Sequence, residues 1–206
     1  KTSSGYSLLH LMIGSEGTLG VITELTLKLI PNPKEDISFI LPFADIDAAI
    51  SAVPKIKLAG LSPQSIEFME RDIVDSSANY TGNKIIPTVI DGKEAGAYIL
   101  VTLDGNDQDE IFQRAETLAE IGDEIGAYDT LVLSHPADKR AVWEARSAFL
   151  TVIEAETDLI DEMDVVVPVD KIPTFLEYAH EIGDKYEVRI RSFGHAGDGN
   201  LHIYCC

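Results

Sequence analysis

Residues 97–105 read AYILVTLDG, an essentially continuous apolar run that ends in the turn pair Asp104-Gly105. A strand that is buried on both faces has such a run, because neither of its faces meets water. We therefore expect residues 97–103 to form a central strand of a sheet.

Segments on both sides of this run alternate between strand and helix patterns. The clearest helix spans about residues 107–121, where Ile111, Ala115 and Leu118 repeat on one helical face. Pro136 suits the first turn of a further, long helix. Helices are expected at 45–59 with an interruption at Pro54, at 70–80, at 136–155 and from 170 to a stop at Gly183, and strands at 37–41, 65–68, 130–133, 164–167, 187–193 and 201–205. This order predicts an α+β fold with a largely antiparallel sheet covered by helices on one side.

The segment before residue 34 has a different pattern. Val21–Ile30 reads VITELTLKLI, in which apolar and polar residues alternate as in a half-buried strand. Pro31 and Pro33 then end that strand, since proline cannot donate to a sheet ladder. We place a domain boundary here, with residues 1–33 in one domain and residues 34–206 in another.

The chain has 206 residues and a formal net charge of −19, from 16 Lys and Arg against 35 Asp and Glu. This balance excludes a nucleic-acid binder, which needs clustered cations, and argues against docking on an anionic membrane. No apolar run approaches the ~20 residues of a membrane span.

The two cysteines are adjacent, at positions 205 and 206, so we expect no disulfide framework and a reducing, cytoplasmic compartment. Because the chain starts without Met and stops within a strand pattern, we expect it to be part of a longer protein.

Gly14–Gly20 reads GSEGTLG and leads directly into the alternating segment. Glycines allow backbone N–H groups to approach an anion or a planar ligand closely. The order differs from a Rossmann fingerprint, in which the glycines follow a strand and open a helix. Two interpretations stay open: a plain tight turn, or a backbone contact to a cofactor.

Residues 193–202 read FGHAGDGNLH, a glycine-rich reversal between two expected strands. His195 and His202 flank the turn, and facing side chains on paired strands lie roughly 4.5–8 Å apart. Two imidazoles at that separation could share a divalent metal, but a catalytic site needs a third ligand. Asp198 is one candidate, although an Asp between two glycines is commonly a turn residue that binds its own backbone.

Arginines lie near these features. Arg146 is placed mid-helix beside Phe149, where it either reaches solvent or clamps a carboxylate. The residues alone leave both alternatives open. Arg189 and Arg191 alternate along the strand that leads to His195, and exposure on a solvated face is the simpler interpretation for them.

Two longer motifs together resemble a known family. The first, residues 8–31, reads LLHLMIGSEGTLGVITELTLKLIP and resembles the end of the FAD-binding domain in flavoproteins of the vanillyl-alcohol-oxidase type. The second, residues 193–204, reads FGHAGDGNLHIY and resembles the signature of the D-lactate dehydrogenase and glycolate oxidase flavoprotein-subunit branch. The resemblance implies that residues 1–33 are a remnant of an α+β FAD-binding domain. Residues 34–206 would then be a ferredoxin-like substrate-binding cap domain, truncated at its C-terminal end.

The resemblance also implies roles for individual residues. His195 and His202 match the pair that holds zinc, iron or manganese in metal-dependent members. Asn200 matches a residue that faces substrate and flavin, and Arg146 matches the arginine that grips the substrate carboxylate. The residues whose backbone is implied to lie along FAD are Gly14, Ser15, Glu16, Gly17, Gly20 and Ile22.

The implied reaction is oxidation of a small D-2-hydroxy acid to the 2-oxo acid, with hydride transfer to the flavin. Two parts of the family pattern are absent: the pyrophosphate-binding loop, and a downstream Glu-His segment that should supply the third metal ligand and the base. We therefore expect this segment alone to be inactive. Branches that act on longer dicarboxylates place a lysine where Glu162 stands, which favours lactate or glycolate over 2-hydroxyglutarate.

Expected partners are an electron acceptor, namely an electron-transfer flavoprotein, an iron–sulfur subunit or a quinone, and a second copy of the chain. Two alternative functions stay open. One is a non-redox metalloprotein that uses the histidine pair with Asp198 as a hydrolytic centre, which leaves the GSEGTLGVITE stretch unexplained. The other is an α+β binding module without catalysis. Uptake of FAD by the full-length protein separates both from the flavoenzyme.

Overall fold

The computed structural model describes residues 4–206 and divides into two compact units, Lys1–Asn32 and Pro33–Cys206. Each unit is described by itself. The division falls within the Pro-Asn-Pro segment where the sequence places a domain boundary.

The first unit contains one helix among its described residues, α1 (Leu8–Met12), which Ser7 caps by accepting a hydrogen bond from the His10 N–H. No strand forms between residues 21 and 30, so the prediction of a half-buried strand there is wrong. Val21 and Leu29, two apolar side chains of this segment, are 88% and 86% exposed. Alternation stabilises a strand only where neighbouring strands complete the ladder and cover the apolar face. None of the described residues does so here.

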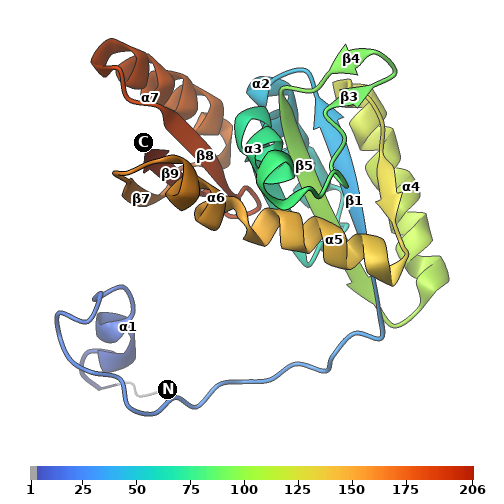
Figure 1. Ribbon diagram of the computed structural model, residues 1–206. Coiled ribbons are helices and arrows are strands. Elements are labelled where there is room, and N and C mark those ends of the chain that lie inside the picture. The colour runs from blue at the N-terminus through green and yellow to red at the C-terminus, as the bar shows by residue number, and fades with distance from the viewer. Residues whose placement is uncertain (1–3) are drawn as a thin grey trace. The chain divides into compact units, whose positions relative to one another are not determined.

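The second unit is built on a seven-stranded sheet (Figure 1). Its strands are β1 (Glu35–Phe43), β2 (Ser65–Glu70), β5 (Ala97–Gly105), β6 (Leu131–Leu133), β7 (Asp161–Val166), β8 (Ile190–His195) and β9 (Asn200–Cys205). They follow the order β6-β1-β5-β2-β8-β9-β7, and every neighbouring pair is antiparallel. A separate hairpin pairs β3 (Val89–Ile90) with β4 (Lys93–Glu94). The predicted antiparallel α+β sheet is thereby confirmed.

Strand β5 lies between β1 and β2, and its residues from Ala97 to Leu103 are buried. The apolar run therefore forms the central strand that the sequence predicts. With the helices α2 (Ile46–Leu58) and α4 (Gln108–Ile125), the first four strands of the large sheet run β1-α2-β2-β5-α4-β6 along the chain. Their sheet order, β6-β1-β5-β2, is that of a ferredoxin-like unit.

Helices cover both faces of the sheet, which corrects the expectation of cover on one side. The remaining helices are α3 (Arg71–Thr81), α5 (Pro136–Ser147), α6 (Phe149–Glu156) and α7 (Ile172–Tyr186), the last preceded by a 3₁₀ turn at Val169–Lys171. One buried cluster joins α2, α4 and α7 to one face of the sheet, and a second joins α3, α5 and α6 to the other. Along β5 the side chains alternate between the two clusters, because successive strand residues point to opposite faces.

Three helix details also differ from expectation. Helix α2 continues through Pro54 without a break. The long helix expected over 136–155 is two helices that meet at Ala148. Gly183 does not end α7 but lies inside it, packed so closely against the chain beyond that a Cβ would come within 2.5 Å of the Val188 carbonyl oxygen. A glycine can thus mark a close approach between segments as well as a helix end. Within residues 4–206, no helix combines the length and the apolar content needed to cross a bilayer.

Candidate functional site

The hairpin of β8 and β9 carries the predicted histidine motif. His195 pairs with Asn200, and Phe193 pairs with His202, so these four residues share one face of the sheet. Gly199 takes a φ of +86°, and a Cβ there would lie 2.1 Å from the Val167 carbonyl oxygen. The glycine-rich sequence is therefore required for a reversal this tight.

The two histidine rings lie 5.5 Å apart between centroids, in an edge-to-face arrangement. The convergence that the sequence predicts for His195 and His202 is thus present. Asp198 is a turn residue, because its side chain accepts a hydrogen bond from the backbone N–H of Asn200. The Asn200 side chain in turn donates to Asp164 Oδ1 at 2.6 Å.

Arg146 reaches the same face from α5. Its guanidinium carbon lies 4.4 Å from the centroid of the Phe193 ring and 5.5 Å from that of Phe149. Burial lowers the pKa of Arg146 below its usual value, and the nearby Glu67 carboxylate partly offsets this effect. The Nε donor of Arg146 is buried without a hydrogen-bond partner among residues 4–206. Such a donor is costly unless a ligand completes its hydrogen bonding.

Glu67 on β2 is a residue of this site that the sequence reasoning missed. Its side chain is 4% exposed and contacts two predicted site residues at once. Oε1 lies 2.9 Å from His195 Nδ1, and Oε2 accepts a hydrogen bond of 3.0 Å from Arg146 Nη2. The available signal was an acidic residue between Ile66 and Phe68, inside an otherwise apolar strand.

Around His202 the polar groups are acidic. Its Nδ1 is buried without a hydrogen-bond partner among residues 4–206, and it lies 3.4 Å from Glu162 Oε1 and 3.9 Å from Asp164 Oδ1. The Tyr204 hydroxyl donates to Glu162 at 2.8 Å. Burial and then that carboxylate raise the pKa of Tyr204, so the phenol remains a hydrogen-bond donor at neutral pH.

A pocket of about 350 Å³ opens beside this cluster. Glu67 and His195 line one part of it, and Lys57 and Ser65 line another. The Ser65 hydroxyl is buried and has no hydrogen-bond partner among the described residues. The pocket lining thus includes a cation, Lys57, and an acidic residue, Glu67.

The histidine pair fits a metal only in part. A ring separation of 5.5 Å suits two nitrogens bound to one ion at about 2.1 Å each. The buried His202 Nδ1 also has no hydrogen-bond partner among residues 4–206. A catalytic zinc needs three protein ligands. No group of three His, Cys, Asp or Glu side chains suited to a metal occurs in the described part of the chain.

The residues predicted to follow FAD lie in the first unit. They line a shallow pocket of about 540 Å³ between Met12 and Ile22. Gly14, Glu16 and Gly17 all have positive φ values, which turn the backbone sharply after α1. A Cβ at either glycine would meet no atom, so open space lies beside the turn. The family resemblance implies a backbone contact to FAD at this open turn.

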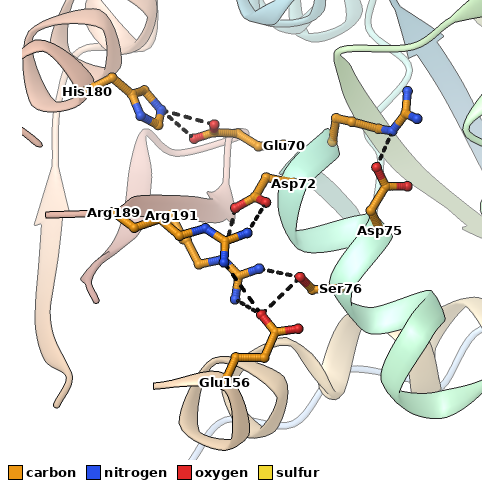
Figure 2. Close-up of polar contacts among 9 residues, drawn as sticks. Glu70, Asp72, Asp75, Ser76, Glu156, His180, Arg189 and Arg191 are labelled. Atoms are coloured by element: carbon orange, nitrogen blue, oxygen red, sulfur yellow. Dashed lines mark hydrogen bonds and ion pairs between the residues drawn. The ribbon is translucent and has the colours of Figure 1, made fainter. Parts of the chain in front are cut away.

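A second polar cluster joins Arg189 and Arg191 at β8 to Asp72 on α3 and Glu156 on α6 (Figure 2). Arg191 is 2% exposed, so the expectation of a solvated arginine is wrong for this residue. It forms ion pairs with Asp72 at 2.9 Å and Glu156 at 2.8 Å, and thereby ties β8 to α3 and α6. Arg189, which is half-exposed, contacts the same two carboxylates.

Beside it, His180 on α7 binds Glu70 at the end of β2, with 3.0 Å between Nε2 and Oε2 (Figure 2). The hydrogen bond from Glu70 raises the pKa of His180, and partial burial opposes that rise. Glu70 also accepts a hydrogen bond from the Ser192 hydroxyl. Among the described residues, neither cluster has a buried polar side-chain atom without a hydrogen-bond partner, which is typical of a structural role.

Comparison with known families gives one match across most of the chain. The family described as FAD linked oxidases, C-terminal domain, matches residues 32–206. Among curated proteins, the D-lactate dehydrogenase of Anaerostipes hadrus is 50% identical over 206 residues, which are 100% of this chain and 43% of that protein. Glycolate oxidase subunit GlcD of Bacillus subtilis is 32% identical over 208 residues, 100% of this chain and 42% of that protein. The chain therefore spans less than half the length of these relatives.

Solved structures with a similar fold have low sequence identity. An alkyldihydroxyacetonephosphate synthase has a TM-score of 0.65 at 16% identity and is covered over 43% of its length by 100% of this chain. A 4-ethylphenol oxidase from Gulosibacter chungangensis has a TM-score of 0.59 at 14% identity, over 87% of this chain and 40% of that one. At these identities the likeness shows the fold alone.

Proposed function

Because this chain belongs to the FAD linked oxidases, C-terminal domain, family, as its two motifs predict, we propose that the protein oxidises a small D-2-hydroxy acid to the 2-oxo acid. The names of the two similar proteins, a D-lactate dehydrogenase and a glycolate oxidase subunit, support a substrate of lactate or glycolate size. Residues 34–206 form the substrate-binding cap in this proposal, and residues 1–33 belong to the FAD-binding domain.

One observation carries the proposal: the four predicted substrate-side residues gather on one sheet face although they come from three elements. Arg146 extends from α5, His195 ends β8, and Asn200 and His202 belong to β9. Phe193 lies among them, 4.4 Å from the arginine and 5.4 Å from the His202 ring centroid. A cation, two imidazoles and an amide over an aromatic floor suit a small anion that also carries a hydroxyl group.

Each residue has a part in binding or orientation. Arg146 holds the substrate carboxylate, because a guanidinium offers several donors in one plane. His195, His202 and Asn200 fix the hydroxyl side of the substrate, so that the Cα–H bond takes a single orientation. Bound FAD supplies the acceptor for the hydride. The chain's own contribution is positioning and electrostatics.

A divalent metal is part of the proposal. His195 and His202 would supply two of its ligands, and zinc, iron and manganese are the candidates. The ion would lower the pKa of the substrate hydroxyl, which eases removal of its proton. The third ligand and the base belong, in this proposal, to a Glu-His segment outside these 206 residues.

Substrate size and redox partner follow from the same reasoning. Glu162 adds a carboxylate beside His202, which disfavours a substrate with a second carboxylate, such as 2-hydroxyglutarate. Electrons would leave to an electron-transfer flavoprotein, an iron–sulfur subunit or a quinone. We place the protein in the cytoplasm, with a second copy of the chain as a further partner.

The test is purification of the full-length protein that carries this chain. We expect a visible flavin spectrum and reduction of that flavin by D-lactate or glycolate, but not by D-2-hydroxyglutarate. The 206-residue chain alone should oxidise none of them. A full-length protein that is colourless and takes up no FAD would overturn the proposal. Zinc binding in such a colourless protein would instead favour the non-redox metalloprotein.

A further inference from the structure

Glu67 links the two halves of the candidate site. It lies on β2, and its partners are 79 residues away on α5 and 128 residues away on β8. Within residues 4–206, its ion-pair partners are Arg146 and His195 alone. Each carboxylate oxygen is committed to one of them, Oε1 to the histidine and Oε2 to the arginine.

The histidine contact selects one ring nitrogen. A carboxylate oxygen only accepts hydrogen bonds, so the 2.9 Å contact requires the proton of His195 to be on Nδ1. The nitrogen that remains for a ligand is therefore Nε2. Carboxylate–histidine pairs of this kind orient metal-binding imidazoles in other proteins, and removal of such a partner typically costs about 10–100-fold in metal affinity.

The arginine contact fixes the position of the guanidinium. The side chains of Arg146 and Glu67 are 11% and 4% exposed, so solvent screens their pairing weakly. Phe193 contacts the same guanidinium, at 4.4 Å. With a buried carboxylate on one donor and an aromatic ring against its plane, Arg146 has little freedom to turn.

We propose that Glu67 is a positioning residue shared by Arg146 and His195, which presets the carboxylate-binding guanidinium and the metal-binding Nε2 with a single side chain. This inference rests on the proposed function and adds to it a residue that acts through Arg146 and His195. Glu67 on β2 thereby couples substrate binding at Arg146, on α5, to metal binding at His195, on β8.

Two variants of the full-length protein separate its two contacts. In Glu67→Ala both contacts are lost, so metal affinity should fall about 10–100-fold and KM for D-lactate should rise about tenfold. In Glu67→Gln the single amide oxygen should turn to the charged Arg146, which is the stronger donor. The amide NH₂ then faces His195 Nδ1 and favours a proton on Nε2. Metal affinity should therefore fall as in the alanine variant, while KM changes by less than about threefold.

The matched control is Glu70→Gln. Glu70 is another buried carboxylate of β2, and it also binds a histidine, His180, but it contacts neither Arg146 nor His195. The Glu70→Gln variant should lose thermal stability, with no change in zinc affinity or in KM for D-lactate. In Glu67→Gln, by contrast, zinc affinity should fall while KM stays nearly unchanged. A purely structural role of Glu67 would not produce that difference.

Zinc titration, KM and melting temperature are measured for all three variants. The inference is overturned if both Glu67 variants keep the zinc affinity and KM of Glu70→Gln. If Glu67→Ala fails to fold, Glu67→Gln decides alone, and unchanged zinc affinity in it overturns the inference. Should the wild-type protein bind no FAD, the proposed function has failed, and zinc titration of the same variants still tests the contact to His195.

Discussion

The imidazole rings of His195 and His202 lie 5.5 Å apart with their planes at 82°. The two residues are diagonal neighbours on β8 and β9, since His195 pairs with Asn200 and His202 with Phe193. Diagonal neighbours on an antiparallel pair are within reach of aromatic and other long side chains. The backbone register, set by a tight glycine-rich turn, therefore holds both rings together before any ligand arrives.

Substitution of both histidines should remove the metal. We expect His195→Ala with His202→Ala to reduce the bound metal of the full-length protein at least about tenfold, because a catalytic site keeps only three protein ligands. Elemental analysis of the purified proteins measures this. His180→Ala is the control, since His180 binds Glu70 instead. Equal metal content in the double variant and the wild type would refute the ligand assignment.

Arg146→Lys should impair binding of the hydroxy acid more than folding. Lysine keeps the charge near Glu67 but loses the planar set of donors, so KM should rise about 10-fold or more. Arg146→Met should in addition destabilise the protein by about 3 kcal/mol, because it leaves the buried Glu67 carboxylate without its cation. Steady-state kinetics and thermal melting check both effects. Arg140→Lys, on the exposed side of the same helix, should change neither.

The two arginines of the second cluster should differ in their effect on stability. Arg191→Met removes a guanidinium that is fully buried between Asp72 and Glu156, and should cost about 2–3 kcal/mol. Arg189→Met removes a half-exposed partner of the same carboxylates and should cost about 0–1 kcal/mol. Chemical denaturation of both variants measures the difference. Equal losses would show that burial of Arg191 does not matter.

The contact between His180 and Glu70 should make stability depend on pH. The pKa of His180 is raised in the folded state, so its contribution is fully present below the unfolded value of about 6.5 and is lost as the pH rises through the folded value. His180→Gln cannot take up the proton. At about pH 5.5 we expect the free energy of unfolding of this variant to be lower than that of the wild type by up to about 1 kcal/mol. At about pH 9 the two free energies should be nearly equal.

Melting temperatures of both proteins across this range test the prediction. A deficit of the variant that is constant with pH would mean that the contact does not depend on protonation of His180. A deficit that grows with rising pH would reverse the predicted sign and contradict the assignment of the proton to the histidine.

Much of the sheet could be predicted from local sequence. Every residue of the run at 97–103 except Thr102 is apolar, and a strand of that kind must be covered on both faces. The glycines and histidines of 193–202 likewise predict a tight hairpin with two imidazoles on it, because the period of two along a strand is local geometry. The two family motifs can also be recognised from the sequence, because each is a continuous stretch.

Local sequence is misleading where the structure depends on residues far away along the chain. Val21–Ile30 has the alternation of a strand, but no described segment pairs with it. Gly183 has the pattern of a helix stop, yet it lies inside α7 and allows close packing against the segment that leads into β8. Arg191 has the pattern of a solvated strand residue, yet it is buried and pairs with carboxylates of α3 and α6.

The sequence by itself determined the antiparallel α+β sheet, the central strand and the histidine hairpin, since each follows from periodicity or turn chemistry within about ten residues. Only the tertiary structure decided that helices cover both faces and that Glu67 joins Arg146 to His195. Those contacts span 79 and 128 residues. Local pattern shows that a residue is inward-facing, but which side chain it meets is set by the order of the strands in the sheet.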